Sequence, residues 1–349
     1  MEYMKAVAVM KPNEVKVVED VPVPEIKDYE ALVKVAYCGF CNGTDMQIIN
    51  GTMQFENYPL ILGHEGAGEV VKLGSKVRNI RIGDRFIHNN LYPDAGNGYG
   101  KAHGGMAQYG IVVDHQAMLE DGYSVSELPF YKKQAKFPKD ISFRDGAMLL
   151  TMCECMSAVR NFGIQKGTEV LIFGAGPMGT ALAAYSRLAG AKTIVMVDGI
   201  EERLVNAKKI AQVNETINFN RNEVSEVIGE RRFDVAIDAV GLTSVILQAS
   251  SFLKPYGRVG ALGVLKKYDC EFDMRKLQNN TMVQMLNFPY GEYDIIDENV
   301  ELIRTGKIKT SDYYSDIMPM DKIDEIADMV RNKKTLKVLV EIDGSLEKE

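Results

Sequence analysis

The chain has 349 residues, of which 46% are hydrophobic and 26% charged, and its formal net charge is −7. This composition is ordinary for a soluble globular protein, and the length exceeds the usual size of one hydrophobic core, so we expect two domains. The negative charge argues against nucleic acid or an anionic membrane as a main partner. No apolar run approaches the ~20 residues that cross a bilayer, and the N-terminus lacks the features of a signal peptide. Five cysteines in so long a chain do not suggest a disulfide framework, so we expect a reducing cytoplasm.

Short runs typical of β-strands, separated by turns, dominate residues 1–150. The expected strands are 3–9, 14–19, 30–38, 66–73 and 107–113. This region is predicted to form a partly closed β-rich domain.

Strand and helix patterns alternate from about residue 165 onward. The expected strands are 169–173, 193–197, 216–219, 234–238 and 258–264. Such alternation predicts an α/β domain with a doubly wound parallel sheet, here residues 151–290. Helices are expected at 294–305 and 321–332 and a final strand at 336–342, and this tail, 291–349, is predicted to complete the first domain.

A glycine motif follows the first strand of that α/β region, in the stretch Glu-Val-Leu-Ile-Phe-Gly174-Ala-Gly176-Pro177-Met178-Gly179. After a strand and before a helix, G-x-G-x-x-G indicates a dinucleotide site. Gly174 permits the tight turn, Gly176 lets the backbone approach a pyrophosphate, and Gly179 allows close packing of helix and strand. The helix N-terminus then offers free N–H groups to phosphates. The alternative is a glycine-rich turn that binds nothing.

Asp198 ends the next strand, roughly 20 residues downstream, where an acidic residue accepts hydrogen bonds from the adenine ribose. Its carboxylate repels a 2′-phosphate, so NAD is favoured over NADP. Arg203 could lie over the adenosine or simply be solvated. Backbone groups near Val240 and Leu262, at later strand ends, are expected to face the nicotinamide.

The stretches Cys38-Gly-Phe-Cys41-Asn-Gly-Thr44-Asp45 and Gly63-His64-Glu65-Gly66 together offer thiolate, imidazole and carboxylate, the ligand types that a catalytic zinc uses. Zinc would polarise an alcohol oxygen and lower its pKa, which eases loss of hydride from the carbon. The alternative is a buried structural cysteine and a hydrogen-bonded core histidine.

Over essentially its whole length the chain resembles the medium-chain, zinc-dependent alcohol and polyol dehydrogenases, including the sorbitol and threonine dehydrogenases. The motifs that carry this resemblance are Cys-Gly-x-Cys with Gly-Thr-Asp (38–45), Gly-His-Glu-Gly-x-Gly (63–68), Gly-Gly-Met-Ala-Gln-Tyr (104–109) and the glycine motif (174–179). The resemblance implies a GroES-like catalytic domain, a Rossmann domain, and a cleft between them. It also implies that Cys41 and His64 are zinc ligands, and that Glu65 ligates the metal or lies beside it.

The chain departs from the family pattern at the first ligand. Relatives usually read Cys-Gly-Thr/Ser-Asp, whereas this chain reads Cys41-Asn42-Gly-Thr44-Asp, one residue longer. Counting back from Gly-Thr-Asp places Asn42 at the metal position, and counting forward from Cys38 places Cys41 there. We favour Cys41 because a neutral amide is a poor zinc ligand beside a thiolate. Thr44 is then expected to pass the substrate proton to solvent.

The third ligand is a second departure. The Cys or Glu usual in the family falls near Leu149 and Leu150, which cannot bind metal. Glu154, about one helical turn farther, is our preferred candidate and Cys153 the second, although Cys153 could contact the nicotinamide instead. If Glu154 is only a solvated helix residue, Glu65 ligates directly or the site holds metal weakly.

A third departure concerns the four-cysteine structural zinc lobe of many relatives. No cysteine occurs between residues 42 and 152, and a Gly/Asn/Tyr-rich loop with His103 stands there instead, so no structural zinc is expected. His88 is expected to be a hydrogen-bonded structural residue. The Met-rich stretches 282–285 and 316–320 are expected in the core or at a subunit interface.

The sequence thus predicts an NAD-dependent oxidoreductase that takes hydride from a secondary alcohol, a polyol, sugar or cyclitol, with one catalytic zinc held by Cys41, His64 and a carboxylate. Two alternatives are a zinc-free quinone or alkene reductase of the same superfamily and a non-catalytic NAD-binding protein. Relatives suggest a homodimer or homotetramer.

Overall fold

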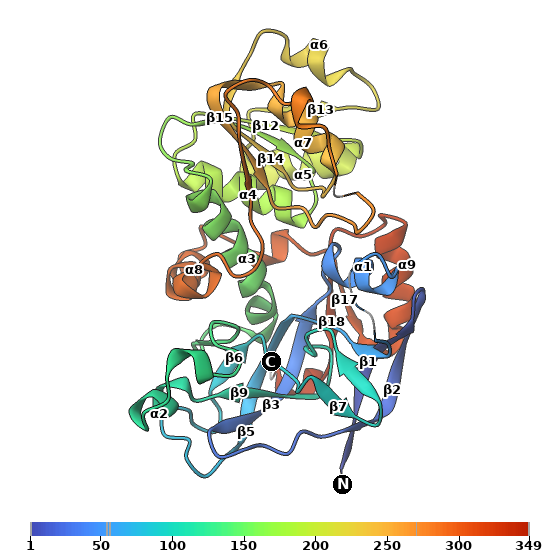
Figure 1. The fold of residues 1–349 in the computed structure, drawn as a ribbon, viewed down its shortest axis with the longest axis vertical. Coiled ribbons are helices and arrows are strands. Elements are labelled where there is room, and N and C mark those ends of the chain that lie inside the picture. Colours follow the sequence, from blue (N-terminus) through green and yellow to red (C-terminus); the bar gives the residue numbers. More distant parts are fainter. Residues whose placement is uncertain (1, 54, 56, 270, 348–349) are drawn as a thin grey trace. The chain divides into compact units, whose positions relative to one another are not determined.

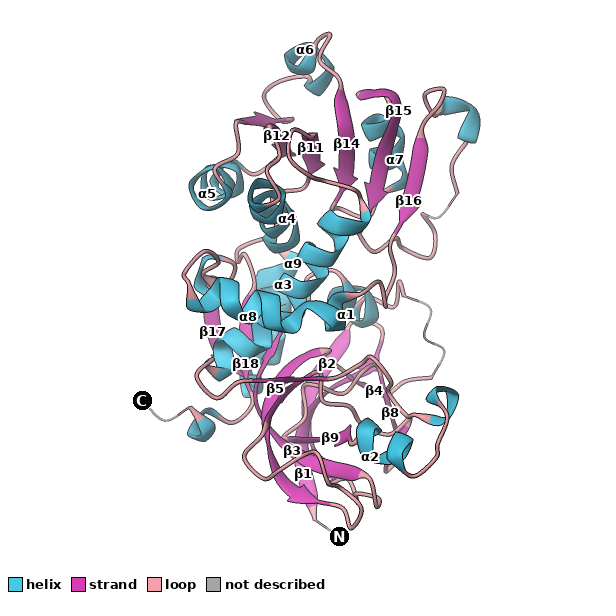
Figure 2. Cartoon of the chain, turned by 90° about the vertical axis from the view of Figure 1, so that its left-hand side faces the viewer, coloured by secondary structure: helices cyan, strands magenta, loops and turns pink. Residues whose placement is uncertain are grey.

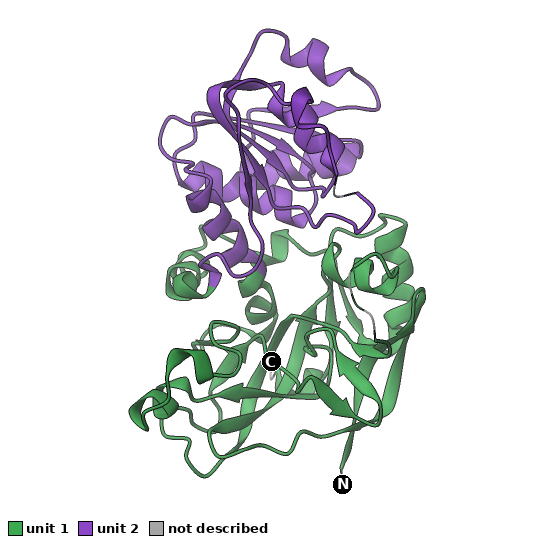
Figure 3. Cartoon of the chain, in the orientation of Figure 1, with its two compact units in different colours: residues 1–150, 293–349 green, residues 151–292 purple. Residues whose placement is uncertain are grey.

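The computed structural model describes residues 2–53, 55, 57–269 and 271–347. The described chain divides into two compact units, coloured separately in Figure 3. Unit 1 comprises residues 1–150 and 293–349, and unit 2 comprises residues 151–292. Helix α3 (Phe143–Asn161) begins in unit 1 and ends in unit 2.

Unit 1 is built mainly from antiparallel strands (Figure 1). One sheet has the order β2-β1-β4-β8-β7, and the other has the order β10-β6-β5-β3-β18-β17 with β9 also paired to β3. The strands are β1 (Tyr3–Lys11), β2 (Glu14–Pro22), β3 (Glu30–Gly39), β4 (Leu60–Ile61), β5 (Glu65–Leu73), β6 (Arg85–Ile87), β7 (Asp94–Gly96), β8 (Tyr99–Lys101), β9 (Tyr109–Val113), β10 (Ala135–Phe137), β17 (Asp316–Pro319) and β18 (Val338–Glu341). The α-helices of this unit are α1 (Thr44–Ile49), α2 (His115–Glu120), α8 (Ile296–Arg304) and α9 (Ile323–Arg331).

The C-terminal tail joins the N-terminal strands in one core. Strand β18 pairs antiparallel with β3, with Val340 opposite Cys38 and Leu339 opposite Gly39. The apolar face of α9 packs with α1 and these strands, and its members Ile323 and Ile326 are buried. Because a strand that is buried on both faces needs apolar residues throughout, β3 reads as an almost continuous hydrophobic run.

Unit 2 is a six-stranded parallel sheet with the order β13-β12-β11-β14-β15-β16 (Figure 2). Its strands are β11 (Glu169–Phe173), β12 (Thr193–Asp198), β13 (Glu215–Asn218), β14 (Phe233–Asp238), β15 (Leu253–Ala261) and β16 (Met282–Met285). Its helices are α4 (Pro177–Leu188), α5 (Glu201–Ala211), α6 (Val224–Ile228) and α7 (Thr243–Ser250). The strand order reverses between β11 and β14, which is the point at which nucleotides bind in open α/β sheets. The predicted fold class is therefore confirmed.

Some local expectations differ from the structure. The Met-rich stretch 282–285 is the edge strand β16, where Met282 and Met285 are 48% and 54% exposed, so a core position is wrong for it. Met320, in the other Met-rich stretch, is buried in unit 1 as expected. The Gly/Asn/Tyr-rich loop contains the β7–β8 hairpin. Among the described residues, no helix has the length and apolar character that a bilayer crossing requires.

Candidate metal centre and nucleotide-binding loop

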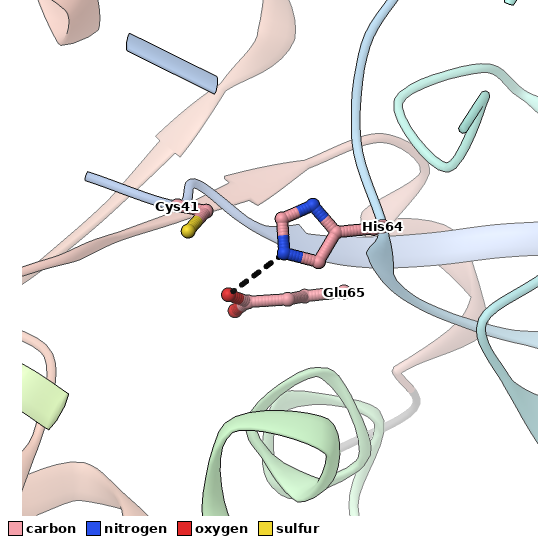
Figure 4. Close-up of side chains that lie close together, drawn as sticks. All are labelled: Cys41, His64 and Glu65. Atoms are coloured by element: carbon pink, nitrogen blue, oxygen red, sulfur yellow. Dashed lines mark ion pairs between the residues drawn. The ribbon is translucent and has the colours of Figure 1, made fainter. Parts of the chain in front are cut away.

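Cys41, His64 and Glu65 come together in unit 1 (Figure 4). Each contributes one ligand atom, and these atoms all lie within 4.8 Å of one another. Cys41 follows β3, while His64 directly precedes β5 and Glu65 begins it. Because β3 and β5 pair with Gly39 opposite Glu65, the end of one strand meets the start of the other, and the three side chains share one space.

Backbone and neighbouring side chains hold the Cys41 sulfur. The Thr44 N–H donates to Sγ at 3.4 Å, and the Cys41 N–H donates to Asp45 Oδ2 at 2.8 Å. The Asn42 side-chain nitrogen donates to the Leu336 carbonyl at 2.7 Å, while its Oδ1 is buried without a hydrogen-bond partner. Cys41 stays the preferred ligand because a neutral amide is a poor zinc ligand beside a thiolate. Thr44 is half-buried at the start of α1, beside the sulfur.

His64 is 7% exposed and lies among negative groups. Its Nε2 is 3.7 Å from Glu65 Oε1, and its Nδ1 is 3.9 Å from Asp45 Oδ1 and has no hydrogen-bond partner. Burial alone lowers the pKa of His64, but the Cys41 thiolate, Asp45 and Glu65 together raise it to about 10. The cluster thus concentrates negative charge around one imidazole, as a cation site requires.

Glu65 already has one cationic partner, Lys337, which is 3% exposed and directly precedes β18. Lys337 Nζ lies 2.7 Å from Oε1 and 2.5 Å from Oε2 of Glu65, which is itself 2% exposed. Gly39 makes room for the pair, since a Cβ there would lie 2.2 Å from Glu65 Oε2. The ammonium neutralises the carboxylate and fixes its place beside His64.

The other predicted third ligands belong to unit 2. Glu154 is half-buried and Cys153 is buried, both on α3 beyond the unit boundary at residue 150. The donor group that the structure assembles within unit 1 contains Glu65 as its carboxylate. Ligation by Glu154 and contact of Cys153 with a nicotinamide stay predictions.

The glycine motif forms the predicted turn in unit 2. Gly174 has φ +102°, a left-handed conformation that favours glycine, and it links β11 to α4. A Cβ on Gly179 would lie 1.8 Å from the Gly174 carbonyl oxygen, whereas a Cβ on Gly176 would meet nothing within 4 Å. Gly179 is thus required by packing. Gly176 is the N-cap residue of α4, directly before Pro177 and Met178, and it leaves open space for a ligand.

Asp198 lies at the end of β12 and supports this loop. Its Oδ2 accepts from the Ala175 N–H at 2.7 Å and its Oδ1 from the Ile200 N–H at 2.9 Å. Arg203 is half-buried in the first turn of α5. Each carboxylate oxygen can accept a further bond, so Asp198 can hold the loop and still meet a ribose.

Val240 and Leu262 follow β14 and β15 at the carboxyl edge of the sheet. The buried carboxylate of Asp238 fixes this edge, because its Oδ1 accepts from the N–H groups of Val240 and Gly241 at 2.8 and 3.0 Å. Val240 is 48% exposed and its Cγ2 faces Gly174. Both residues lie at the carboxyl ends of strands, as expected, and their contact with a nicotinamide stays a prediction.

Residues near the metal donors include several that the sequence reasoning did not assign to the site. Asp45 and Lys337 were missed, and their only sequence signals were the acidic end of the Gly-Thr-Asp motif and a lysine at the start of an apolar strand. His88 is buried and its Nδ1 is hydrogen-bonded to the Tyr293 hydroxyl, as the structural role predicted. His103 lies against His64, and burial lowers its pKa to about 3, helped by the charges of His64 and nearby lysines.

Comparison with known proteins identifies the family. Residues 27–120 match the model of the alcohol dehydrogenase GroES-like domain, and residues 177–304 match that of the zinc-binding dehydrogenases. Sorbitol dehydrogenase of Bombyx mori is 27% identical over 350 residues, covering 95% of this chain and 97% of that protein. L-threonine 3-dehydrogenase of Ruegeria pomeroyi is 31% identical and covers 75% and 78%.

Solved structures of similar proteins support the same family assignment. A protein assigned as a zinc-binding dehydrogenase of Sinorhizobium meliloti 1021, solved with NADP, has a TM-score of 0.78 at 25% identity, covering 98% of this chain and 100% of that one. The fold and the assembled donors define an NAD(P)-dependent alcohol oxidoreductase. The chain belongs to the medium-chain zinc alcohol and polyol dehydrogenase family.

Proposed function

We propose that this protein oxidises a secondary alcohol of the polyol, sugar or cyclitol class with NAD and one catalytic zinc. The observation that carries the proposal is the group of half-buried Cys41 with buried His64 and Glu65, whose ligand atoms lie within 4.8 Å of one another. In the overall reaction the alcohol and NAD⁺ give a carbonyl compound, NADH and a proton. The carbon–hydrogen electron pair leaves as hydride, and the hydroxyl proton goes to solvent.

The donor set fits a catalytic zinc ion. Thiolate, imidazole and carboxylate are common zinc ligands, and three protein ligands leave one position open. The His64 Nδ1 and Asp45 Oδ1 atoms, buried without hydrogen-bond partners, also suit a site that gains a cation. When bound, zinc supplies a Lewis acid that lowers the pKa of a substrate hydroxyl.

The protein's own residues bind the metal, move the proton and bind the coenzyme. Cys41, His64 and a carboxylate, Glu65 or Glu154, hold the metal, and Asp45 orients the imidazole. Thr44 stands beside the sulfur and takes the hydroxyl proton toward solvent. The loop from Gly174 to Gly179 binds the coenzyme pyrophosphate through N–H groups at the start of α4, and Val240 and Leu262 line the nicotinamide end.

NAD is our proposed coenzyme because of Asp198. Its carboxylate stands at the end of β12, where it accepts from the adenine ribose and repels a 2′-phosphate. The Sinorhizobium protein was solved with NADP, so the choice of coenzyme must be argued from this chain's own residues.

Relatives support the substrate class. The matching proteins include one named sorbitol dehydrogenase, after a polyol, and one named probable D-xylulose reductase A, after a ketose. The proposal also places the protein in a reducing cytoplasm as a homodimer or homotetramer. The four described cysteines, 38, 41, 153 and 155, are not joined in disulfides, which suits that compartment.

One observation favours a second candidate, a zinc-free reductase of the same superfamily. The Glu65 carboxylate already forms an ion pair with Lys337, so it is less available to a metal ion. If Glu154 does not ligate either, Cys41 and His64 alone would hold a metal weakly. Hydride would then pass to an activated alkene or quinone.

A panel of polyols, sugars and cyclitols, read as NADH formation at 340 nm with NAD and NADP in parallel, tests the main proposal. We expect turnover of at least one secondary alcohol, faster with NAD. Protein that holds zinc and binds NADH, yet oxidises no member of the panel, would contradict the proposal and favour a non-catalytic NAD-binding protein.

A further inference from the structure

Three imidazoles of unit 1 lie in a row that begins at the proposed ligand His64. The His64 and His103 rings lie 5.2 Å apart between centroids, and the His88 and His103 rings lie 6.1 Å apart. His103 thus lies between His64 and His88 in this chain of contacts. The Tyr293 hydroxyl is hydrogen-bonded to His88 Nδ1.

The segments around this cluster are held in strained conformations. His88, His103, Phe130 and Lys132 all have φ between +53° and +106°, although none is glycine. Asn90 Nδ2 joins two of the segments, because it donates to the His88 carbonyl at 3.0 Å and to the Lys133 carbonyl at 3.1 Å. Strain of this kind persists where the surrounding structure fixes it, and it gathers at binding sites.

Two lysines, Lys101 and Lys133, add positive charge beside the histidines. Their charges contribute, after burial, to lowering the pKa of His88 and of His103. Lys101 is half-buried with its Nζ 4.2 Å from the centre of the Phe130 ring, and Lys133 is exposed. Within the described chain, neither ammonium forms an ion pair or a hydrogen bond, whereas the intervening Lys132 pairs with Asp294 at 3.0 Å.

A half-buried ammonium without a counter-ion is costly, because burial removes water that stabilises the charge. Burial and, secondly, the charge of Lys133 lower the pKa of Lys101 to about 8. Asp294, a carboxylate next to Tyr293, forms an ion pair with Lys132. The Lys101 ammonium therefore has no negative partner among the described residues, and an anionic ligand could supply one.

We propose that Lys101 and Lys133, with the His103 ring, form a subsite for a phosphate or carboxylate group of the substrate. This inference rests on the proposed function and narrows it to alcohols that carry an anionic group. Because His103 contacts His64, the anion binds within one small-substrate length of the reacting hydroxyl. The coenzyme's phosphates have their own N–H donors in unit 2, so the substrate is the source that we assign.

Phosphate binding tests the subsite without any turnover. Inorganic phosphate is titrated by calorimetry into zinc-loaded protein saturated with NADH, so that the glycine loop is occupied. We expect Lys101→Met to weaken phosphate binding about tenfold or more, and Lys133→Met to weaken it less because Lys133 is exposed. Lys72→Met, an exposed lysine of β5 with the same change of charge, should bind like wild type. Equal affinity in all four proteins would overturn the proposal.

Turnover identifies the source of the anion. Five- and six-carbon alditols are compared with their terminal monophosphates and the corresponding aldonates. We expect kcat/KM to favour an anionic member about tenfold or more, and Lys101→Met to lose that preference while Lys101→Arg retains most of it.

A neutral alditol used equally well by wild type would overturn the inference and leave the proposed function standing. Weaker NADH binding in Lys101→Met with unchanged preference would assign the subsite to the coenzyme and also overturn it. Absence of any oxidation with phosphate binding intact would instead contradict the proposed function alone.

Discussion

The two sites of this molecule are built in opposite ways. The nucleotide loop of unit 2 is local, since Gly174, Gly176 and Gly179 follow one strand and their role lies in the backbone. The candidate metal centre of unit 1 is assembled from side chains far apart in sequence, with Glu65 and its partner Lys337 separated by 272 residues. The loop depends on the absence of side chains, and the metal centre depends on buried charges that must balance one another.

The largest effect on stability is expected when the buried Lys337–Glu65 ion pair is broken. Lys337→Met leaves the Glu65 carboxylate buried without its cation, which costs about 3–5 kcal/mol in the free energy of unfolding of the metal-free protein. Urea denaturation measures this loss. Zinc in excess should recover part of it, because the added cation faces the same carboxylate.

Its matched control is the double variant Lys337→Met/Glu65→Gln, which removes both charges and should recover most of the stability. A Lys337→Met protein that unfolds at the same urea concentration as wild type would show that the ion pair does not support the metal centre.

In the glycine loop, the effect of a substitution is expected to depend on the space around the added methyl group. Gly179→Ala places a methyl group 1.8 Å from the Gly174 carbonyl oxygen, so the helix must move, at a cost of about 1–3 kcal/mol. Gly176→Ala meets no atom within 4 Å and should leave stability unchanged while weakening NADH binding, because the methyl group takes the place of a phosphate. Thermal unfolding and NADH fluorescence titration check both variants. If Gly176→Ala bound NADH as wild type does, the loop would not contact the coenzyme.

A smaller effect is expected for coenzyme preference. Asp198→Asn removes the charge but keeps an oxygen that can accept from the Ala175 N–H. We expect the ratio of kcat/KM for NAD over NADP to fall about tenfold, which corresponds to about 1.4 kcal/mol. An unchanged ratio would mean that Asp198 serves the loop and does not meet the ribose.

The same contrast explains what the sequence could predict. Alternating strands and helices and the G-x-G-x-x-G motif are contiguous patterns, so the parallel sheet and the turn at Gly174 followed from local rules. The antiparallel pairing of β3 with β5 and β18 is long-range, so the contact of Lys337 with Glu65 could not be read from spacing. The motifs around Cys41 and His64 identified these donors through resemblance, and the structure brings them together with Glu65.

Composition and spacing left two further questions open. The Met-rich stretch 282–285 was expected in the core or at a subunit interface, and the exposure of β16 contradicts the core position alone. Spacing allowed either Cys41 or Asn42 as the ligand, so the preference for Cys41 rests on ligand chemistry and stays a prediction. The lysines at 101 and 133 carry no motif, and only the fold brings them near the histidines.

Zinc affinity of wild type, His64→Ala and His115→Ala tests the central claim most directly. His115 lies on α2, where its ring bonds the Pro129 carbonyl, and serves as the matched control. We predict about one zinc per chain in wild type and in His115→Ala, affinity reduced about 100-fold or more in His64→Ala, and NADH affinity within a few-fold in all three. Wild-type protein that binds zinc no better than His64→Ala, or holds less than about a tenth of an ion per chain, would contradict the account.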